Sequence, residues 1–320
     1  MAGLRITMIG CGGIANREHY PALASFPEVE IVGACDIDAG CLHATADRWE
    51  IEGRYADYRE MIEAEAPDAI YVIMRPHHLY DAAAWCLQRG LHLFMEKPPG
   101  ITTYQTRSLA QIAQREGCLT MVGLNRRYSP LLNACRDLVL SRGPVSMVVC
   151  GGYVAHGDRP GYYDGALDIL HCHGVHYLDT LRWLAGEVTS MASQVRTAER
   201  DFPTGWYALT RHESGCSGMT MLNWQAGGAR PHDFEMHGHG VSIFASLRDG
   251  ARVFIEGEED VQALAQFGPA PPDDPLRHYG FREENRHFVD CLLAGREPLT
   301  NLPDAAKSME LADQVYATAR

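Results

Sequence analysis

Residues 4–15 read LRITMIGCGGIA, a short apolar run that ends in closely spaced glycines and leads into a helix-like pattern. In this G-x-G-x-x-A arrangement Gly10 permits a tight turn, Gly12 lets the backbone approach a pyrophosphate, and Ala15 lets the helix pack closely on the strand. The helix N-terminus adds backbone donors and the positive end of a dipole. The stretch predicts a dinucleotide-binding turn whose cofactor contacts are Gly10, Gly12, Gly13 and Ile14.

An acidic residue closes the second apolar run, residues 30–35. Asp36 follows Ala15 by about 21 residues, near the spacing at which a carboxylate binds the ribose hydroxyls of adenosine. The same carboxylate would repel a 2′-phosphate, and the segment CDID at 35–38 contains no arginine or lysine. NAD is therefore favoured over NADP, with Ile37 as a further cofactor contact. An ordinary strand–helix turn with a solvated aspartate is the alternative interpretation.

Apolar strands and amphipathic helices alternate through the first 124 residues. This alternation is typical of a parallel sheet covered by helices on both faces. After this region β-rich segments dominate, which predicts a mostly antiparallel sheet that is open on one face. The expected fold class is α/β, with a Rossmann dinucleotide-binding domain over 1–124 and a C-terminal α/β domain for substrate binding and oligomerisation over 125–320.

The pattern places the individual elements as follows. In the first domain strands are expected at 4–9, 30–35, 69–74, 91–95 and 118–123, and helices at 14–25, 39–49, 80–89 and 102–116. In the second domain strands are expected at 145–153, 188–197, 206–212, 217–224, 234–239, 241–246 and 251–256, and helices at 130–140, 175–185, 282–294 and 304–319.

Composition narrows the class of partner. The 320 residues carry a formal net charge of -13, which argues against nucleic acid because its phosphate backbone requires basic patches. No apolar run is long enough to span a bilayer, and the N-terminus enters a strand pattern without a signal-peptide pattern. The ten scattered cysteines contain no C-x-x-C pair, which indicates reduced thiols. We expect a cytoplasmic protein with a small-molecule ligand and no membrane partner.

A second motif, Glu96-Lys97-Pro98, directly follows the strand expected at 91–95. Strand carboxyl ends in such sheets face the ligand crevice, so this pair points toward the cofactor. A lysine near a nicotinamide can donate a hydrogen bond to a substrate oxygen and stabilise a developing alkoxide. From spacing alone, a surface ion pair at a strand end fits equally well.

These motifs, together with several others, resemble the glucose–fructose oxidoreductase, inositol dehydrogenase and rhizopine-catabolism family. The resemblance covers nearly the whole chain and rests on Gly10–Ala15, Asp36, Pro76, AAAWCLQRGLHLFMEKP at 82–98, VGLNRRY at 122–128, HYLD at 176–179 and WLAG at 183–186. It implies an N-terminal Rossmann domain and a C-terminal α/β domain whose open sheet often forms an oligomer interface. It also implies hydride transfer between nicotinamide and a secondary hydroxyl of a sugar, inositol or related polyol.

The resemblance also assigns roles to residues. Lys97 matches the family's active-site lysine, Glu96 its partner near the nicotinamide ribose, and His176 its catalytic histidine. Oxidation of a secondary alcohol needs a base near neutrality, and histidine suits that task. Three more residues complete the predicted cofactor contacts: Met74, Pro76 and Arg127.

The predicted substrate contacts are Lys97, Asn125, Tyr153, Cys172, His173 and His176, with His156, Tyr162 and Tyr163 near Tyr153 in the sequence. For Asn125 and Arg127 the alternative is a linker anchor.

Two positions depart from the family pattern. Cys172 stands where the family often has an aspartate four residues before the histidine, and on a regular helix it would lie beside His176. A thiol cannot orient the imidazole as a carboxylate does, so His176 acts with Lys97 alone, or Asp168 or another acid substitutes, or catalysis is impaired. Tyr80 stands where the family commonly has histidine, which alters the nicotinamide side of the pocket.

A metal site is the alternative interpretation of the histidines. His171, Cys172, His173 and His176 are close in sequence, and in a strand His237 and His239 would share a face, with His232 nearby. No second ligand cluster is obvious, so polar residues lining a sugar pocket are favoured and no metal is expected.

Three functional hypotheses follow. The leading one is an NAD-dependent dehydrogenase or reductase acting on a sugar, inositol or related polyol. The second is a non-redox sugar-processing enzyme that uses tightly bound NAD transiently for elimination or glycoside cleavage. The third is a non-catalytic dinucleotide-binding regulator. By analogy with the family, a homodimer or homotetramer is expected.

Overall fold

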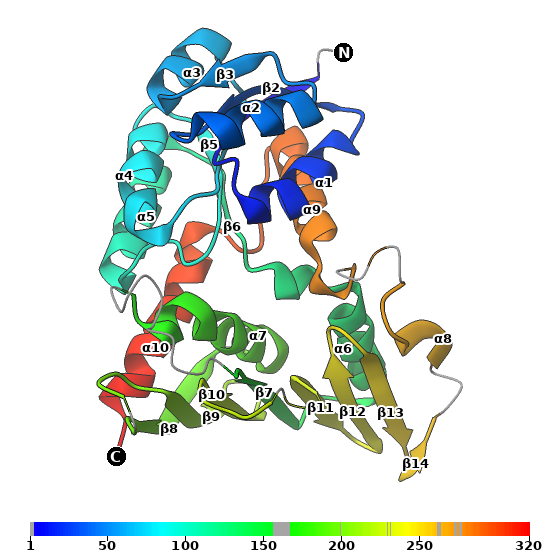
Figure 1. Cartoon of the computed structure of the whole chain (residues 1–320). Helices are drawn as coiled ribbons and strands as arrows, with labels where there is room; N and C mark the ends of the chain where they lie inside the picture. The colour runs from blue at the N-terminus through cyan, green and yellow to red at the C-terminus, as the bar shows by residue number, and fades with distance from the viewer. Residues whose placement is uncertain are drawn as a thin grey trace. The chain divides into compact units, whose positions relative to one another are not determined.

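The chain forms two compact units in a computed structural model, which describes residues 3–155, 167–198, 200–228, 230, 232–260, 264–271, 274 and 277–320. The first unit comprises Met1–Leu124 and Phe281–Ala306, and the second comprises Asn125–Gly280 and Lys307–Arg320 (Figure 1). Three residues named above, His156, Tyr162 and Tyr163, lie outside the described residues. Within the described part of the chain, no helix has the length and apolar character needed to cross a bilayer.

Six parallel strands build the sheet of the first unit, in the order β3-β2-β1-β4-β5-β6. Their bounds are β1 Leu4–Ile9, β2 Val29–Cys35, β3 Gly53–Tyr55, β4 Ala69–Val72, β5 His92–Met95 and β6 Thr120–Val122. The strand order reverses at β1, the position where dinucleotides bind in open α/β sheets. In register, Ile9 lies opposite both Cys35 and Val72, and Val72 lies opposite Met95. The carboxyl ends of β1, β2, β4 and β5 therefore meet at one edge.

The helices of this unit are the π-helix η1 Ala15–His19, α1 Tyr20–Ala24, α2 Ala39–Arg48, α3 Tyr58–Glu65, α4 Pro76–Leu87, α5 Thr103–Glu116 and α9 Phe281–Ala294. A side chain caps the start of α2, α3 and α5. The Asp38 carboxylate accepts a hydrogen bond from the Cys41 N–H at 2.9 Å, and the Thr102 hydroxyl accepts one from the Gln105 N–H at 3.2 Å. Helix α4 starts at Pro76, four residues before the predicted start, because proline is pre-organised for the first helical position.

The second unit contains an eight-stranded sheet in the order β14-β13-β12-β11-β7-β10-β9-β8. Its bounds are β7 Met147–Tyr153, β8 Val188–Arg196, β9 Gly205–His212, β10 Ser217–Asn223, β11 Phe234–Gly238, β12 Val241–Ser246, β13 Gly250–Ile255 and β14 Glu258–Glu259. The strands pair antiparallel except for β7 and β10, which are parallel. The prediction of a mostly antiparallel sheet is confirmed.

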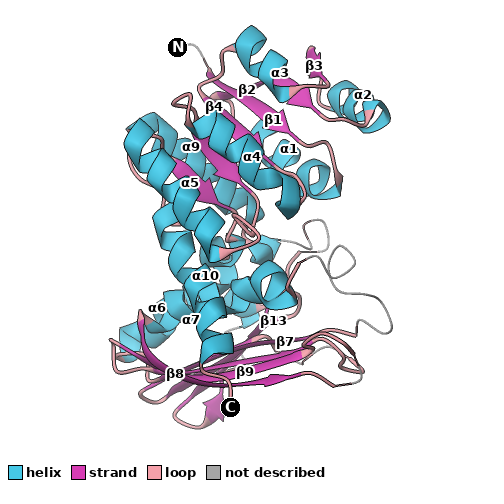
Figure 2. Ribbon diagram, turned by 90° about the vertical axis from the view of Figure 1, so that its left-hand side faces the viewer, coloured by secondary structure: helices cyan, strands magenta, loops and turns pink. Residues whose placement is uncertain are grey.

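Helices cover one face of this sheet. They include α6 Pro130–Arg142, α7 Val175–Ala185 and the second half of α10 Leu302–Ala317, with the short elements η2 Asn125–Tyr128, η4 Leu170–Gly174, α8 Leu264–Phe267 and η6 Arg277–Tyr279. Trp206, Phe234 and Leu178 are buried between the sheet and these helices. Figure 2 shows no helix on the opposite face among the elements it draws, so the predicted open face is present.

The first unit differs from the predicted boundary at 1–124, because it also contains Phe281–Ala306. The reason is aromatic packing across the sheet: the Phe288 ring on α9 lies 5.7 Å from that of Tyr71 and 5.8 Å from that of Phe94. Helix α9 also contacts α1, far away in the sequence (Figure 1). The Thr300 hydroxyl donates to the Val122 carbonyl at 2.9 Å, which ties the following segment to β6.

Because of this packing, we expect the Phe288 side chain to contribute strongly to the stability of the first unit. Its side chain is fully buried, so Phe288→Ala should lower the free energy of unfolding by about 3–5 kcal/mol, as large-to-small core substitutions of phenylalanine do. Urea unfolding measures the effect. Leu293→Ala on the same helix is the matched control, since that side chain is 58% exposed and should change stability by about 0.5 kcal/mol or less. Equal effects from both variants would contradict the assignment.

Candidate active site

The glycine turn follows β1 directly. The backbone of the turn requires glycine at position 10, whereas Gly12 and Gly13 leave space beside it. Gly10 has φ +110°, and a Cβ there would lie 1.9 Å from the Ile73 carbonyl oxygen, so the turn itself requires glycine. A Cβ at Gly12 or Gly13 would meet nothing within 4 Å. These two positions leave open space at the start of the helix, which is the room that a pyrophosphate needs. The turn therefore fits a dinucleotide.

The Asp36 carboxylate is held beside this turn by the backbone. Its Oδ2 accepts a hydrogen bond from the Cys11 N–H at 2.8 Å, and its Oδ1 accepts one from the Asp38 N–H at 2.9 Å. The next side chain, Ile37, is 95% exposed. A fixed carboxylate at the end of β2 can accept the ribose hydroxyls of adenosine, and an exposed apolar side chain beside it offers a surface for the adenine ring.

Glu96 and Lys97 stand at the end of β5, on the same edge of the sheet. Glu96 is buried, and its carboxylate does not form the surface ion pair considered above. Its Oε1 lies 3.0 Å from His19 Nε2, and its Oε2 accepts the Lys97 N–H at 3.1 Å. A Cβ at Gly123 would lie 3.2 Å from Glu96 Oε1, so this glycine makes room for the carboxylate.

Sequence reasoning missed His19. It lies at the end of η1, is fully buried, and bonds to the acid of the E-K-P motif. A histidine six residues after Gly13 was the signal available, but the distance in sequence to Glu96 hid the pairing.

The other predicted contacts of the first unit lie near the end of β4. Met74 is half-buried and Pro76 is buried as the first residue of α4. The Tyr80 hydroxyl lies 2.8 Å from the Ser108 hydroxyl on α5. The tyrosine that replaces the family's histidine therefore links α4 to α5.

In the second unit, Arg127 and Asn125 both serve as anchors. The Arg127 guanidinium donates two hydrogen bonds to Asp179, at 2.9 and 2.5 Å, and both side chains are buried. Ser308 donates a third bond to the same carboxylate at 2.7 Å. The Asn125 amide donates to the Tyr279 carbonyl at 2.9 Å. These bonds fit the alternative of a linker anchor, and a contact of either residue with cofactor or substrate stays a prediction.

His173 and His176 are brought together, and Cys172, next to His173, is buried. The two imidazole rings are 6.3 Å apart, and the His173 ring also contacts Trp224 at 4.9 Å. Both histidines are half-buried, while Cys172 is buried. Residues 170–174 form a π-helix, where the prediction had assumed an α-helix.

Asp168 does not substitute for the missing aspartate beside His176. Its Oδ2 lies 2.6 Å from His171 Nδ1, and its Oδ1 accepts the Tyr316 hydroxyl at 2.5 Å. The other ring nitrogen of His171 lies 2.9 Å from Asp313. Burial opposes ionisation of both groups, but these bonds outweigh it, so the pKa of Asp168 is lowered and the pKa of His171 is raised. His171 is thus tied to two carboxylates, away from any shared site with His173 and His176.

The remaining candidates lie in the sheet of the second unit. Tyr153 ends β7, half-buried, with the Arg230 guanidinium 5.5 Å from its ring centroid. Strand β11 ends at Gly238, so the alternation that would have placed His239 on the face of His237 does not reach it. His237 Nδ1 lies 2.9 Å from the Ser242 hydroxyl, and His232 Nε2 lies 3.0 Å from Glu235.

The glycine turn offers a direct test of cofactor binding. Gly12→Ala should weaken NAD binding at least tenfold while leaving the melting temperature unchanged, because the new methyl group enters the space for the pyrophosphate and touches no protein atom. Gly10→Ala should instead lower the melting temperature, since the backbone there is left-handed and Ile73 blocks the methyl group. Calorimetric titration and thermal melting measure the two effects. NAD binding by Gly12→Ala at the wild-type affinity would contradict this site.

Comparison with known proteins agrees with this geometry. Residues 4–124 match the oxidoreductase family with an NAD-binding Rossmann fold, and residues 153–244 match the C-terminal domain of the same family.

Two curated relatives are similar to the chain. D-apiose dehydrogenase from Paraburkholderia graminis is 28% identical over 98% of this chain and 87% of that protein. Rhizopine catabolism protein MocA from Rhizobium meliloti is 27% identical over 69% of this chain and 72% of that protein.

A solved structure, a dehydrogenase from Clostridium difficile, shares the fold with a TM-score of 0.85 at 19% identity, covering 99% of each chain. Both family domains are thus present here, in order. The chain belongs to the glucose–fructose oxidoreductase, inositol dehydrogenase and rhizopine-catabolism family of NAD-binding oxidoreductases.

Proposed function

We propose that the protein is an NAD-dependent dehydrogenase or reductase that transfers hydride between nicotinamide and a secondary hydroxyl or ketone of a sugar, inositol or related polyol. The observation that carries the proposal is the placement of Glu96 and Lys97 at the same sheet edge as the Gly10 turn and Asp36. Relatives named D-apiose dehydrogenase and inositol 2-dehydrogenase support the substrate class.

NAD is the cofactor that the first unit fits. Asp36 presents a carboxylate whose position two backbone N–H groups fix, and a 2′-phosphate would bring a second negative charge against it. Gly10, Gly12, Gly13 and Ile14 would hold the pyrophosphate at the helix start. Ile37 would face the adenine, and Met74, Pro76, Glu96 and Arg127 are the further contacts proposed.

In the mechanism that follows, each residue has a separate task. Lys97 donates a hydrogen bond to the reacting oxygen of the substrate and stabilises the negative charge that develops there. His176 accepts the hydroxyl proton during oxidation and returns it during reduction. Bound NAD supplies the carbon that accepts or releases the hydride. Asn125, Tyr153, Cys172 and His173 are the remaining residues proposed to contact substrate.

Lysine is a rare residue type in this chain. The sequence contains two lysines, Lys97 and Lys307, while its other cationic side chains are arginines and histidines. Arginine stays charged at every accessible pH, whereas a lysine presents a compact ammonium that can donate to one oxygen. A lysine retained at the strand end of an arginine-rich chain supports a chemical role there. Lys307, by contrast, is exposed and pairs with Glu187 at 2.9 Å.

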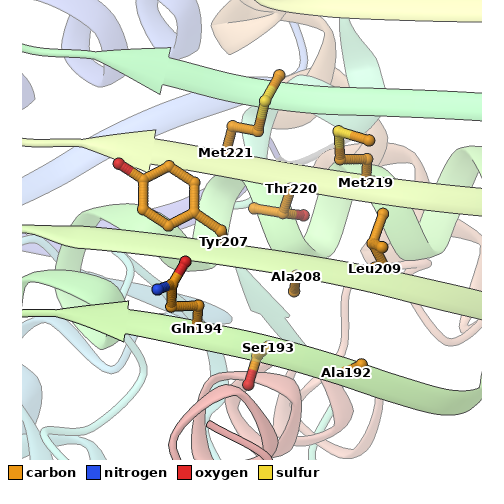
Figure 3. Close-up of a pocket in the computed structure, with 9 residues that line it drawn as sticks. All are labelled: Ala192, Ser193, Gln194, Tyr207, Ala208, Leu209, Met219, Thr220 and Met221. Atoms are coloured by element: carbon orange, nitrogen blue, oxygen red, sulfur yellow. The ribbon is translucent and has the colours of Figure 1, made fainter. Parts of the chain in front are cut away.

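The second unit is proposed to form the interface of a homodimer or homotetramer through its open sheet face. Figure 3 shows a hollow on this sheet lined by side chains of β8, β9 and β10, including Tyr207, Leu209, Met219 and Met221. Leu209 is 57% exposed, and such apolar patches commonly mark protein–protein contacts. All ten cysteines are free thiols, which supports the proposed cytoplasmic location.

The lysine role has a matched control in the chain. Lys97→Ala should lower kcat by about a hundredfold or more, as loss of a donor to a developing oxyanion does, with the Kd for NAD changed by less than about threefold. Lys307→Ala should retain the wild-type rate. The assay follows NADH absorbance with a panel of inositols, hexoses, sugar acids and pentoses. A wild-type rate for Lys97→Ala on the best substrate would contradict the role.

The same assay separates the other hypotheses. NAD binding without net NADH formation on any substrate would favour transient redox chemistry or a regulatory role over the dehydrogenase.

The proposed interface is tested by Leu209→Glu. A buried, unpaired carboxylate at a subunit contact is costly, so the variant should shift the molar mass in solution toward that of the monomer. Light scattering coupled to size-exclusion chromatography measures the mass. Leu293→Glu, an exposed site on α9, is the control and should leave the mass unchanged. A wild-type mass for Leu209→Glu would exclude this face as the interface.

A further inference from the structure

A buried carboxyl group behind the E-K-P motif has no role in the function proposed above. Glu284 lies on α9, has no solvent exposure, and neither of its carboxyl oxygens has a hydrogen-bond partner among the residues that the structure describes. An unsatisfied buried carboxylate is among the most costly groups a protein can contain. The group must therefore be neutral, or a cation must accompany it.

Glu284 faces the pair that supports Lys97. One side-chain atom from each of His19, Glu96 and Glu284 lies within 4.8 Å of the others, and all three residues are buried. Glu96 already bonds to His19 and to the Lys97 N–H. Two carboxylates so close together in an interior of low dielectric cannot both ionise, and the one without donors is the one that keeps a proton.

The surroundings of Glu284 agree with this assignment. Burial raises the pKa of Glu284 well above its ordinary value, and the charges of Glu96, Glu18 and Glu283 raise it further. Tyr71, from β4, is also fully buried, and its hydroxyl has no partner among the described residues. The groups that face Glu284 are thus carboxylates, an imidazole and a phenol.

The contacts of His19 determine which of its ring nitrogens donates to Glu96. Its ring is packed against Phe94 at 5.1 Å and Phe281 at 6.3 Å between centroids, and its Nδ1 lies 3.2 Å from the Asn285 amide nitrogen. That amide also donates to the Phe281 carbonyl at 2.7 Å, so α9 fixes its orientation. Nδ1 also lies 3.3 Å from the Asn285 amide oxygen, so the bond to Glu96 decides the position of the proton: an ionised carboxylate can only accept, and Nε2 therefore donates to it.

We propose that His19 and a protonated Glu284 are positioning residues that keep Glu96 as the single ionised carboxylate of this cluster and thereby fix Lys97. His19 orients the Glu96 carboxylate through Nε2. Glu284, being neutral, leaves the negative charge on Glu96, whose second oxygen holds the Lys97 backbone. The charge assignment stands independently of the proposed function, whereas the consequence for Lys97 rests on it.

The pH dependence of the free energy of unfolding shows whether Glu284 is protonated in the folded chain. Above a pH of about 4.3 the carboxyl group loses its proton in the unfolded chain but keeps it in the folded one. Unfolding then releases a proton, so stability falls as pH rises. The unfolding equilibrium constant of the wild type should increase about tenfold per pH unit relative to that of Glu284→Gln, between pH 5 and the folded-state pKa.

Urea unfolding at several pH values measures this ratio, and Glu63→Gln, an exposed site on α3, is the control whose ratio should stay flat. A flat ratio for Glu284→Gln from pH 5.5 to 8 would show an ionised Glu284 and overturn the proposal.

Two further measurements do not depend on the Gln variant folding. The infrared spectrum of the wild type at pH 7 should contain the carbonyl stretch of a buried protonated carboxyl group, and its absence would overturn the proposal. Elemental analysis of the purified protein tests the other way to neutralise the site. One equivalent of a divalent metal whose removal by a chelator lowers the melting temperature would replace the proton by a metal ion and overturn the proposal.

The positioning role is tested at His19. Glutamine can place a donor near the position of Nε2 whereas leucine cannot, so His19→Gln should retain kcat within about threefold and His19→Leu should lower it about tenfold or more. The rate is expressed per NAD-binding site, counted by calorimetry. If His19 had a purely structural role, His19→Leu would lower the number of NAD-binding sites and the total rate in proportion. The rate per site would then stay unchanged, and that result would overturn the positioning role. If no substrate is turned over, the proposed function fails, while the stability and infrared measurements still decide the charge of Glu284.

Discussion

Parallel hydrogen bonding of β1 to β2 and β4 is the constraint on which the rest of the first unit depends. Because Ile9 lies opposite both Cys35 and Val72, the turn at Gly10, the carboxylate of Asp36 and the start of α4 come to one edge of the sheet. Gly10 is the tightest point of this arrangement, since the Ile73 carbonyl occupies the place of a side chain. A change in strand register would separate the glycine turn from Asp36, and with it the geometry that a dinucleotide requires.

The interior beneath that edge contains a polar cluster surrounded by aromatic rings. His19 and Glu96 form a buried pair, with Glu284 beside them and Phe94, Tyr71 and Phe288 around them. A buried polar group destabilises the fold unless it is satisfied, so its retention in this place points to a requirement of the site rather than of stability. The second unit also contains a buried charged pair whose hydrogen bonds are satisfied. Arg127 donates two hydrogen bonds to the Asp179 carboxylate, and Ser308 donates a third.

The predictions made from sequence succeeded where local chemistry decides the structure. The helix at 175–185 and the strand at 241–246 have the predicted bounds, because their apolar periodicity and flanking glycines are local signals. The strand at 53–55 was missed, since three residues at a sheet edge carry too little pattern. The π-helix at 170–174 was missed as well, because hydrogen bonding of that kind leaves no period in the sequence.

The amino-acid sequence by itself determined the α/β class, the glycine turn with its acidic strand end, the E-K-P element and the family. All of these depend on residues close together in the chain, where turn chemistry and spacing are sufficient. Only the tertiary structure decided that α9 joins the first unit, that Asp168 accepts the Tyr316 hydroxyl, and that Glu284 lies within reach of Glu96. Glu96 and Glu284 are 188 residues apart in the sequence, and no local pattern encodes a contact that arises only when helix and sheet pack around a shared core.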